Sequence, residues 1–477
     1  MDWLDISNLA SSIPKEIHSV VNQKALVRFK EELSLLHTSE RFTTLLAVHD
    51  AFKDLMNIKR SEKLKLIFKS LLFFVAAVLV SVFYWRIGRL YKFNLLYDPP
   101  VPVRSKSERL SLHAFLKSPR FGFACSNTYI VQDRKLSFRG YWDKQIVPVF
   151  SIDLYLMSTL SLSERCRFVV RNFRNLITFF RLVPINPTII HCYKELFFTI
   201  PCSRLALKRG AISEICITNS NWLYQPTTVH LRGNHVKAYM LWYSDNSASK
   251  YKDHLLSKSD FSAYGLAPVD CHYVWTKEFS SFLSQFTKAL VRDVGSILFY
   301  ESENFDRLDN GILSITHKST DVLVFDVVPF EEPNNHDYYT KSRAFAFLLG
   351  IQHLREEYQR LGSVVQPKFA IKHKRKLQPS HSKEYSVLVN SLIRPQGNWE
   401  KIPEDSNIYS LIKSARLIVA PPFTSPALVA KELGVPSCFL DLGDNPTDFD
   451  NYCGLPVFRT YENFSLFAQG ILNFPMT

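Results

Sequence analysis

The sequence predicts an α/β protein with two Rossmann-like, doubly wound domains and an N-terminal helical, membrane-associated segment. Three observations lead to this prediction. Short apolar runs alternate with helical patterns, which is typical of parallel sheets flanked by helices. A chain of 477 residues with 46% hydrophobic side chains is large enough to fill two or three domain cores. A separate apolar run near residue 75 is long enough for a membrane helix.

The first part of the chain is predicted to be helical. Apolar residues recur at helical spacing over 14–36, so we expect an amphipathic helix within a helical N-terminal region, residues 1–62. The run 66–85 is uncharged apart from Lys69. Twenty helical residues reach roughly 30 Å, about the thickness of a bilayer core. Residues 63–92 are therefore predicted to form a membrane-associated helix.

The flanks of this apolar run leave its topology open. Basic residues lie on both sides of it, so the loop charges favour neither orientation. A span, a re-entrant helix and a helix lying on an anionic leaflet all agree with the pattern, and a buried core helix is the alternative without a membrane. An extended, proline-rich stretch follows, so residues 93–119 are expected to form a stiff linker.

Two Rossmann-like domains are expected after the linker, the first at residues 120–310 and the second at 311–477. In the first domain, strands are predicted at 214–218 and 237–243 and a helix at 279–291. In the second domain the order is strand 321–328, helix 342–361, strand 368–371, helix 383–393, helix 407–414, strand 416–420 and strand 437–441. This alternation predicts a parallel, doubly wound sheet.

The turn between the last two of these strands has the pattern of a phosphate-binding turn. Pro421 and Pro422 stop the strand, Thr424 or Ser425 is suited to cap the next helix, and Gly434 ends that helix. Such a turn lies at the carboxyl edge of a parallel sheet, where open sheets bind ligands. Hydroxyls beside a helix N-terminus suit a phosphate, because that end offers N–H donors and partial positive charge. Helix capping alone explains the same residues equally well.

The run Pro-Phe-Thr-Ser at 422–425, with Ala-Lys-Glu-Leu-Gly-Val-Pro-Ser at 430–437, resembles the signature of the bacterial polysaccharide-biosynthesis PFTS-motif proteins. These are surface-carbohydrate or O-antigen enzymes. The C-terminal half is also similar to GT-B glycosyltransferases, especially bacterial sialyltransferases and polyol-phosphate transferases. The resemblance implies an N-terminal acceptor domain facing a C-terminal nucleotide-donor domain across a cleft. It also implies that Thr424 and Ser425 hold the donor phosphate.

The same resemblance implies further donor contacts. In the sialyltransferase-like enzymes a His-Pro pair after an equivalent strand contacts the donor phosphate, which indicates His373 here, together with its neighbour Lys372. Lys374 stands in place of that proline, so the match is incomplete. Glu432, on the helix after the turn, matches an acidic residue that holds a donor hydroxyl. A solvated basic loop and an exposed helix carboxylate explain these residues without a ligand.

Polar residues at strand ends are candidates for the acceptor side and for the catalytic base. Asn219 and Ser220 follow one predicted strand of the first domain, and Ser244 and Asp245 follow another. Asp245 is a candidate base if its carboxylate reaches the acceptor hydroxyl. Asp326, at the end of the first strand of the second domain, and Glu331 and Glu332 just after it are alternative candidates. Turn chemistry explains the residues of the two turns without any function.

Composition limits the partners. The formal net charge of +14 permits nucleic acid, anionic lipid or anionic metabolites as partners. No zinc-finger spacing, RNA-binding signature or long basic run favours nucleic acid. The eight cysteines lack a CxxC or tight metal spacing, so we expect neither a disulfide framework nor a metal site. The predicted location is the membrane, with the catalytic domains facing the cytoplasm.

The sequence therefore predicts a membrane-associated, metal-independent glycosyltransferase without a cofactor. It would move a sugar from a nucleotide-sugar donor to a surface polysaccharide or a lipid-linked glycan, with basic groups and helix dipoles replacing a divalent ion. Two alternatives stay open: a polyol-phosphate transferase that uses a CDP-linked donor, and a non-catalytic membrane scaffold in glycan assembly. Phosphate in the transferred group would mark the first alternative, and failure to bind any nucleotide would favour the second.

Overall fold

The computed structural model of the chain describes both predicted α/β domains. The described residues are 60–83, 92–99, 112–113, 116–117, 128–132, 146–182, 195–218, 226–242, 267–285, 287–295, 320–329, 340–360, 366–373, 382–393, 399–403, 406, 408–443 and 449–472. The helix predicted at 14–36 lies outside them.

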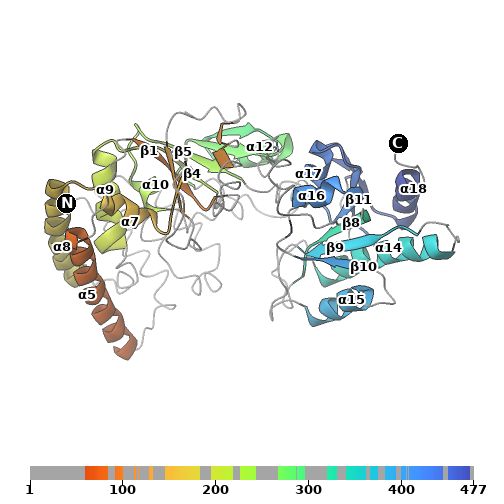
Figure 1. Ribbon diagram of the computed structural model, residues 1–477, viewed down its shortest axis with the longest axis horizontal. Helices are drawn as coiled ribbons and strands as arrows, with labels where there is room; N and C mark the ends of the chain where they lie inside the picture. Colours follow the sequence, from red (N-terminus) through yellow and green to blue (C-terminus); the bar gives the residue numbers. More distant parts are fainter. Residues whose placement is uncertain are drawn as a thin grey trace, which may run out of the picture.

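The N-terminal domain contains a parallel sheet, drawn in red to green in Figure 1. Its described strands, in the spatial order β3-β2-β1-β4-β5-β6-β7, are β1 (Phe93–Tyr97), β2 (Thr128–Gln132), β3 (Ile146–Val149), β4 (Ile212–Ile217), β5 (Lys237–Leu241), β6 (Cys271–Val274) and β7 (Leu290–Asp293). The helices described in this domain are α5 (Arg60–Phe83), α7 (Ile152–Ser158), α8 (Leu162–Leu182), the π-helical turn η3 (Glu195–Thr199), α9 (Ile200–Lys208), α10 (Thr227–Leu231) and α12 (Lys277–Leu283).

The C-terminal domain contains the second sheet, drawn in cyan to blue (Figure 1). Its described strands, in the order β10-β9-β8-β11-β12-β14-β13, are β8 (Thr320–Asp326), β9 (Phe369–His373), β10 (Trp399–Ile402), β11 (Ala415–Ala420), β12 (Ser437–Leu440), β13 (Asn451–Tyr452) and β14 (Leu455–Phe458). Only β13 runs antiparallel within the described part of this sheet. The helices described here are α14 (Lys341–Arg360), α15 (Lys383–Ile393), α16 (Ile408–Lys413), α17 (Ser425–Glu432) and α18 (Tyr461–Leu472).

Both sheets have the doubly wound strand order. In each, the first strand lies in the middle, the next two strands add on one side, and the fourth adds on the other side. The chain therefore changes direction between β1 and β4 in the first sheet and between β8 and β11 in the second. Open α/β sheets bind ligands at such switch points, outside the carboxyl ends of the strands. The prediction of two Rossmann-like, doubly wound domains is confirmed.

Most elements predicted for the second domain agree with the structure within two residues at each end, and α15 has the predicted bounds. The reason is that its central strands are short apolar runs buried on both faces. β11 is buried along its length apart from the half-buried Arg416, as expected for a central parallel strand. Gly434 ends α17 with φ +72°, and the amide of Val435 donates to the carbonyl of Ala430 over 2.9 Å, which is the Schellman closure.

The predicted linker at 93–119 is wrong at its start, because β1 lies within it. Residues Phe93–Tyr97 are all buried, and β1 pairs in parallel with both β2 and β4. β1 is thus the central strand of the N-terminal sheet, and this domain begins well before residue 120. The strand is only five residues long and contains Asn94, so it has little signal of its own beside the proline-rich stretch after it.

The predicted helix at 279–291 is wrong in its second half. Helix α12 ends at Leu283, and Leu290–Asp293 form strand β7 at the edge of the sheet. Most side chains of β7 are exposed, so no apolar alternation marks the strand in the sequence. Pairing with β6, a tertiary interaction, is what makes this segment extended.

Helix α5 is packed onto the N-terminal domain. Its ring contacts include Phe74 with Phe173 of α8 and with Phe197 of η3, at centroid distances of 5.3 and 5.5 Å. One stripe of the helix is buried: Ser70, Phe74, Ala77 and Ser81. In the described part of the chain, no helix has both the length and the apolar character needed to cross a membrane. The transmembrane span that the sequence allowed is therefore not supported.

Arg165, near the start of α8, forms hydrogen bonds that connect this helix to the ends of α5 and α7. Its side chain is buried, and its guanidinium donates to the carbonyl oxygen of Ser81 over 2.5 Å and to that of Leu160 over 3.1 Å. Two weaker bonds reach the carbonyls of Met157 and Ser158, at 3.4 and 3.5 Å. Ser81 and Ser158 lie in the last turns of α5 and α7, where the helix dipole leaves partial negative charge. This arginine therefore satisfies carbonyls that two helix ends leave unpaired.

We expect Arg165→Met to lower the free energy of unfolding by about 2 to 3 kcal/mol, because it leaves buried carbonyl groups without their donor. Arg167→Met, at an exposed position on the same helix, is the matched control and should change stability by less than about 0.5 kcal/mol. Chemical denaturation of both variants measures the difference. Equal stability of the two variants would contradict the role given to Arg165.

Candidate functional site

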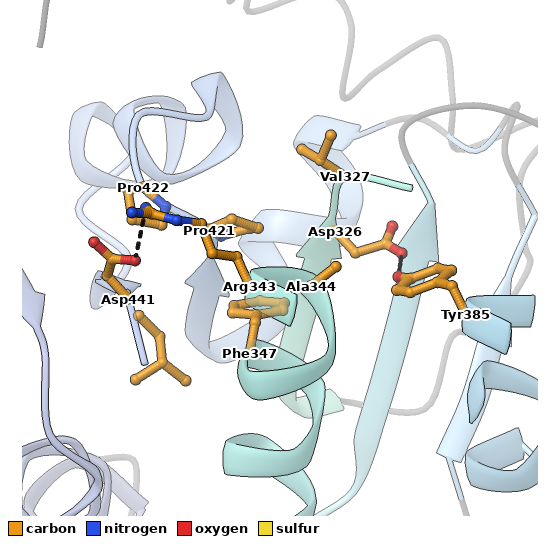
Figure 2. Close-up of a pocket in the computed structure, with 10 residues that line it drawn as sticks. Asp326, Val327, Arg343, Ala344, Phe347, Tyr385, Pro421, Pro422 and Asp441 are labelled. Atoms are coloured by element: carbon orange, nitrogen blue, oxygen red, sulfur yellow. Dashed lines mark hydrogen bonds and ion pairs between the residues drawn. The ribbon is translucent and has the colours of Figure 1, made fainter. Parts of the chain in front are cut away.

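A recess opens at the switch point of the C-terminal sheet (Figure 2). The carboxyl ends of β8, β11 and β12 and the beginnings of α14 and α15 form its wall. Its polar lining residues are Asp326, Arg343, Tyr385 and Asp441, and Pro421 and Pro422 lie between the two carboxylates. The recess therefore occupies the place where a doubly wound sheet binds its ligand.

Two helices, α14 and α15, begin in the wall of this recess, and a third, α17, begins just after Pro422; the three differ in how their N-termini are capped. Thr340 and Ser382 accept from the backbone amides of Arg343 and Tyr385, at 3.4 and 3.2 Å, and so cap α14 and α15. Thr424 precedes α17 but makes no side-chain cap bond. Its buried hydroxyl instead donates to the carbonyl of Pro421 over 2.9 Å. The N-terminus of α17 thus keeps its donors and partial positive charge without a side-chain cap.

The turn before α17 is held in an unusual shape by Phe423. This residue has φ +64°, a left-handed conformation that costs a bulky residue of the order of 1 to 3 kcal/mol. Its ring is buried and packs against Phe439, Phe449 and Tyr452, at centroid distances of 6.0, 5.9 and 4.8 Å. These aromatic contacts offset the strain, so they fix the direction in which the turn delivers the chain to α17.

A buried network surrounds Asp326. His373 Nδ1 lies 2.8 Å from Asp326 Oδ2, and the hydroxyl of Tyr385 donates to the same oxygen. Both the carboxylate and the imidazole are almost completely buried. Burial, together with the charge of Asp326, holds the pKa of Tyr385 well above its usual range, so the phenol stays a donor. Among the described residues, Asp326 Oδ1 and His373 Nε2 have no hydrogen-bond partner.

Arg343 and Asp441 form the opposite side of the recess (Figure 2). Arg343 Nη1 lies 3.3 Å from Asp441 Oδ1, and the carboxylate is 2% exposed while the arginine is 16% exposed. Gly443 makes room for this arginine, because a Cβ there would lie 3.0 Å from the Cα of Arg343 and 2.4 Å from its Cγ. The recess thus has a positive group, held in place by a buried carboxylate, at one end and the Asp326 carboxylate at the other.

The structure places one predicted site residue, Asp326, in the lining of the recess. Thr424 is buried in the turn and Ser425 begins α17, and neither is among the lining residues. His373 is turned towards Asp326 and is not among the lining residues. A direct contact between its ring and a donor phosphate stays a prediction.

Two predicted donor residues lie apart from the recess lining. Lys372 is a buried residue of β9, and Glu432 is exposed in the last turn of α17. Glu432 lies near Tyr409, where burial first and the carboxylate second raise the pKa of the phenol. The sequence analysis missed Arg343 and Tyr385, whose positions in helix patterns carry no sign of a site. Asp441 had one usable signal, since it closes a predicted strand.

The predicted acceptor-side residues lie outside the described part of the chain. They are Asn219, Ser220, Ser244 and the candidate base Asp245. Lys374, which replaces the proline of the related enzymes, also lies outside it.

A different polar cluster lies beside the carboxyl end of β1. The hydroxyls of Tyr97 and Thr228 lie 3.0 Å apart, and that of Ser203 lies 2.9 Å from Thr228. Nearby, Thr199 donates to Asp153 Oδ2 over 2.9 Å. Burial raises the pKa of Asp153 to about 6, and the bond from Thr199 opposes that shift.

In the part of the chain that the structure describes, no group of three or more His, Cys, Asp or Glu side chains is placed to hold a metal ion.

The model of the polysaccharide biosynthesis PFTS motif protein family matches residues 177–463. This match spans more than half of the 477 residues. The chain belongs to this family. The resemblance found in the sequence is thus confirmed, and the motif lies in the turn between β11 and α17, whose Pro421 and Pro422 line the recess.

No curated protein matches this PFTS motif protein. Among solved structures, it is similar to a UDP-GlcNAc 2-epimerase from Methanocaldococcus jannaschii, with a TM-score of 0.40, 13% identity and coverage of 80% of this chain and 93% of that one. For the wall teichoic acid polymerase TagF the TM-score is 0.41 and the identity 9%, with coverage of 87% of this chain and 91% of that one. For the pneumococcal O-GlcNAc transferase GtfA the TM-score is 0.34 and the identity 10%, with coverage of 57% of this chain and 52% of that one. At these low TM-scores the similarities decide nothing further about the PFTS motif protein.

The two hydroxyls of the motif are expected to differ in their effect on stability. Thr424→Val removes the buried bond to the carbonyl of Pro421 and should lower the free energy of unfolding by about 1 kcal/mol. Ser425→Ala should change it by less than about 0.5 kcal/mol, because Ser425 is half-buried at the first position of the helix. Denaturation in urea compares the variants. An equal loss in both would show that Thr424 has no special structural part.

Asp153 is expected to make stability depend on pH. Its pKa is raised in the folded protein, to about 6 from 3.8, so the folded state binds its proton more tightly than the unfolded chain does. Stability should therefore fall as the pH rises from about 4 to about 6 and stay level above that, by up to about 3 kcal/mol. Asp153→Asn keeps an acceptor for Thr199 and should remove this part of the slope. Glu400→Gln, on an exposed residue, is the control that should leave it.

Proposed function

We propose that this protein is a glycosyltransferase of the GT-B type, which moves a sugar from a nucleotide-activated donor to a surface polysaccharide or lipid-linked glycan. The observation that carries the proposal is the recess at the switch point of the C-terminal sheet. There a held arginine and a buried carboxylate with one unpartnered oxygen lie around one space, and α17, which has no side-chain cap, begins just after Pro422 of its wall. Membership of a polysaccharide biosynthesis family supports the same reaction class.

The two ends of the recess suit the two parts of such a donor. The phosphate part of the donor would lie at the end with Arg343, and we assign it also to Ser425 and the N-terminus of α17 just after Pro422, since cations and helix N-termini stabilise phosphate oxygens. Negative charge grows on this leaving phosphate or diphosphate as the bond to the sugar breaks. A fixed arginine and a fixed dipole stabilise that charge without moving, which lowers the barrier to transfer. In this proposal they take the place of a divalent metal ion, and no cofactor beyond the nucleotide-sugar itself is needed.

Asp326 suits the hydroxyl-bearing part of the donor. A carboxylate repels phosphate but accepts strongly from hydroxyl groups. Its Oδ2 is already occupied by Tyr385 and His373, so the rotation of the carboxylate is fixed, and its Oδ1 is buried beside the recess without a hydrogen-bond partner. We assign Asp326 a hydroxyl of the sugar or ribose, and His373 the role of positioning this carboxylate. The role as catalytic base that the sequence allowed for Asp326 is not part of this proposal.

The proposal keeps the membrane-associated location with the catalytic domains facing the cytoplasm. The N-terminal sheet would supply the acceptor side, as its own switch point places polar residues at the carboxyl end of β1. A lipid-linked acceptor requires access to a membrane, and the net charge of +14 favours an anionic leaflet.

Nucleotide binding by the full-length protein tests the donor site. We expect one class among CMP, UDP and GDP, with its sugar conjugates, to raise the melting temperature, because a ligand of the folded state adds about 2.7 kcal/mol of stability at one hundred times its Kd. Arg343→Gln should weaken that binding by about ten- to a hundredfold. Arg360→Gln, at the exposed far end of the same helix α14, should bind as the wild type does.

No response to any nucleotide, or equal binding by both arginine variants, would overturn the assignment of this recess. Mass spectrometry of the product then identifies the reaction. An added sugar supports glycosyl transfer, whereas an added polyol phosphate would show transfer from a CDP-linked donor instead. Activity lost in EDTA and restored only by a divalent cation would contradict the metal-independent mechanism.

A further inference from the structure

Helix α5 carries an apolar stripe that faces away from the domain. The exposed side chains Leu64, Phe68, Leu72, Val75, Leu79 and Val82 are each 48% to 63% accessible to solvent. Each lies three or four residues after the one before it, so they form one line along the helix. This line lies opposite the buried stripe that packs on α8 and η3. The fold is thus complete without it, since it adds nothing to the core of the domain.

Helix α8 has a stripe of the same kind. Its exposed apolar side chains are Leu162, Val170, Phe173, Ile177 and Phe180, at 47% to 64% exposed. The two helices lie side by side at the outer end of the N-terminal domain (Figure 1), joined by the contact of Phe74 with Phe173. Eleven of the sixteen exposed large hydrophobic side chains in the described part of the chain lie on these two stripes. We call the two stripes together the α5/α8 face.

Exposed cations accompany the α5/α8 face. At 3.6 residues per turn, they fall beside the apolar stripe of each helix and not opposite it. They are Lys65 and Lys69 on α5, and Arg167, Arg174 and Arg181 on α8. The acidic residue of α8, Glu164, is paired with Arg209 at 3.3 Å. The face therefore combines apolar side chains with net positive charge.

This combination selects an anionic membrane among the possible partners. Apolar stripes of this extent mark interaction surfaces, and helices with apolar and basic sides lie in the interface of anionic bilayers with their apolar side about 5 to 10 Å deep. A second copy of the chain is disfavoured, because two copies of the face would bring their cations together. A neutral apolar partner would leave the cations without a counter-charge.

We propose that the α5/α8 face docks the protein on an anionic membrane, with both helices lying along the bilayer surface. The buried stripe of α5 stays packed on the domain, so the helix contacts lipid through its outer stripe. Docking through two helices bound to one rigid domain fixes its orientation on the bilayer, as a single flexible anchor would not. The inference deepens the membrane association within the proposed function, but its test needs no nucleotide.

Vesicle flotation of the full-length protein tests the α5/α8 face. We expect the protein to bind vesicles of phosphatidylcholine that contain about 30% of the anionic lipid phosphatidylglycerol. Binding to vesicles of phosphatidylcholine alone should be weaker. Phe68→Glu with Leu72→Glu on α5, and Val170→Glu with Ile177→Glu on α8, should each lower the partition coefficient by about tenfold or more. Arg174→Gln with Arg181→Gln should weaken binding to the anionic vesicles only.

Val387→Glu with Leu466→Glu, on equally exposed residues of α15 and α18, is the matched control and should bind as the wild type does. Unchanged binding by the α8 variant would overturn the proposal, since a contact through α5 alone does not need α8. The proposal would also be overturned if the wild type bound neither vesicle. A dimer seen in light scattering would overturn it too, if the α5 and α8 variants abolished that dimer without changing vesicle binding. Thermal denaturation of each variant checks its fold, and nucleotide binding by the variants tests the donor site separately.

Discussion

The candidate site depends on the turn that Phe423 holds in a left-handed conformation. The strain of that backbone is offset because the ring is buried among Phe439, Phe449 and Tyr452. This turn places Pro421 and Pro422 in the wall of the recess, and α17 begins directly after it. A residue that never reaches the recess thus decides where its helix N-terminus lies. The phenylalanine of the motif has a structural role, whereas Pro422 of the motif lines the recess.

Two buried carboxylates with different partners determine where charge lies at the recess. Asp441 holds Arg343, a positive group of fixed charge, whereas Asp326 receives its hydrogen bonds from the neutral phenol of Tyr385 and from His373. The first arrangement places a cation at the recess, and the second places there a carboxylate whose Oδ1 is buried without a hydrogen-bond partner. Under the proposed function, these groups of opposite sign at the two ends of the recess would orient a donor that has both a phosphate part and a hydroxyl part.

Helix α5 shows that the two sides of one apolar helix can lie in different surroundings. One stripe joins the domain core and the opposite stripe is exposed, with Arg165 fastening the end of the helix to α7 and α8. In the sequence the two stripes form a single apolar run, so the length and hydropathy of that run alone predict a membrane helix. Packing separates them, because only one side of a helix can face a domain.

The sequence by itself determined the elements whose signals are local. The buried strands of the second domain, the helices between them and the closure at Gly434 follow from short apolar runs, helical spacing and the freedom of glycine at positive φ. The turn motif also identified the family. These features could be predicted because the residues that produce them are neighbours along the chain.

Only the tertiary structure decided which of these elements meet. β1 and β7 exist through pairing with other strands, so the central strand was placed in a linker and the edge strand in a helix. Arg343, Tyr385 and Asp441 come together with Asp326 because strand order brings three carboxyl ends and two helix beginnings to one point. Pairing and burial between distant segments depend on the whole fold, which no window of sequence contains.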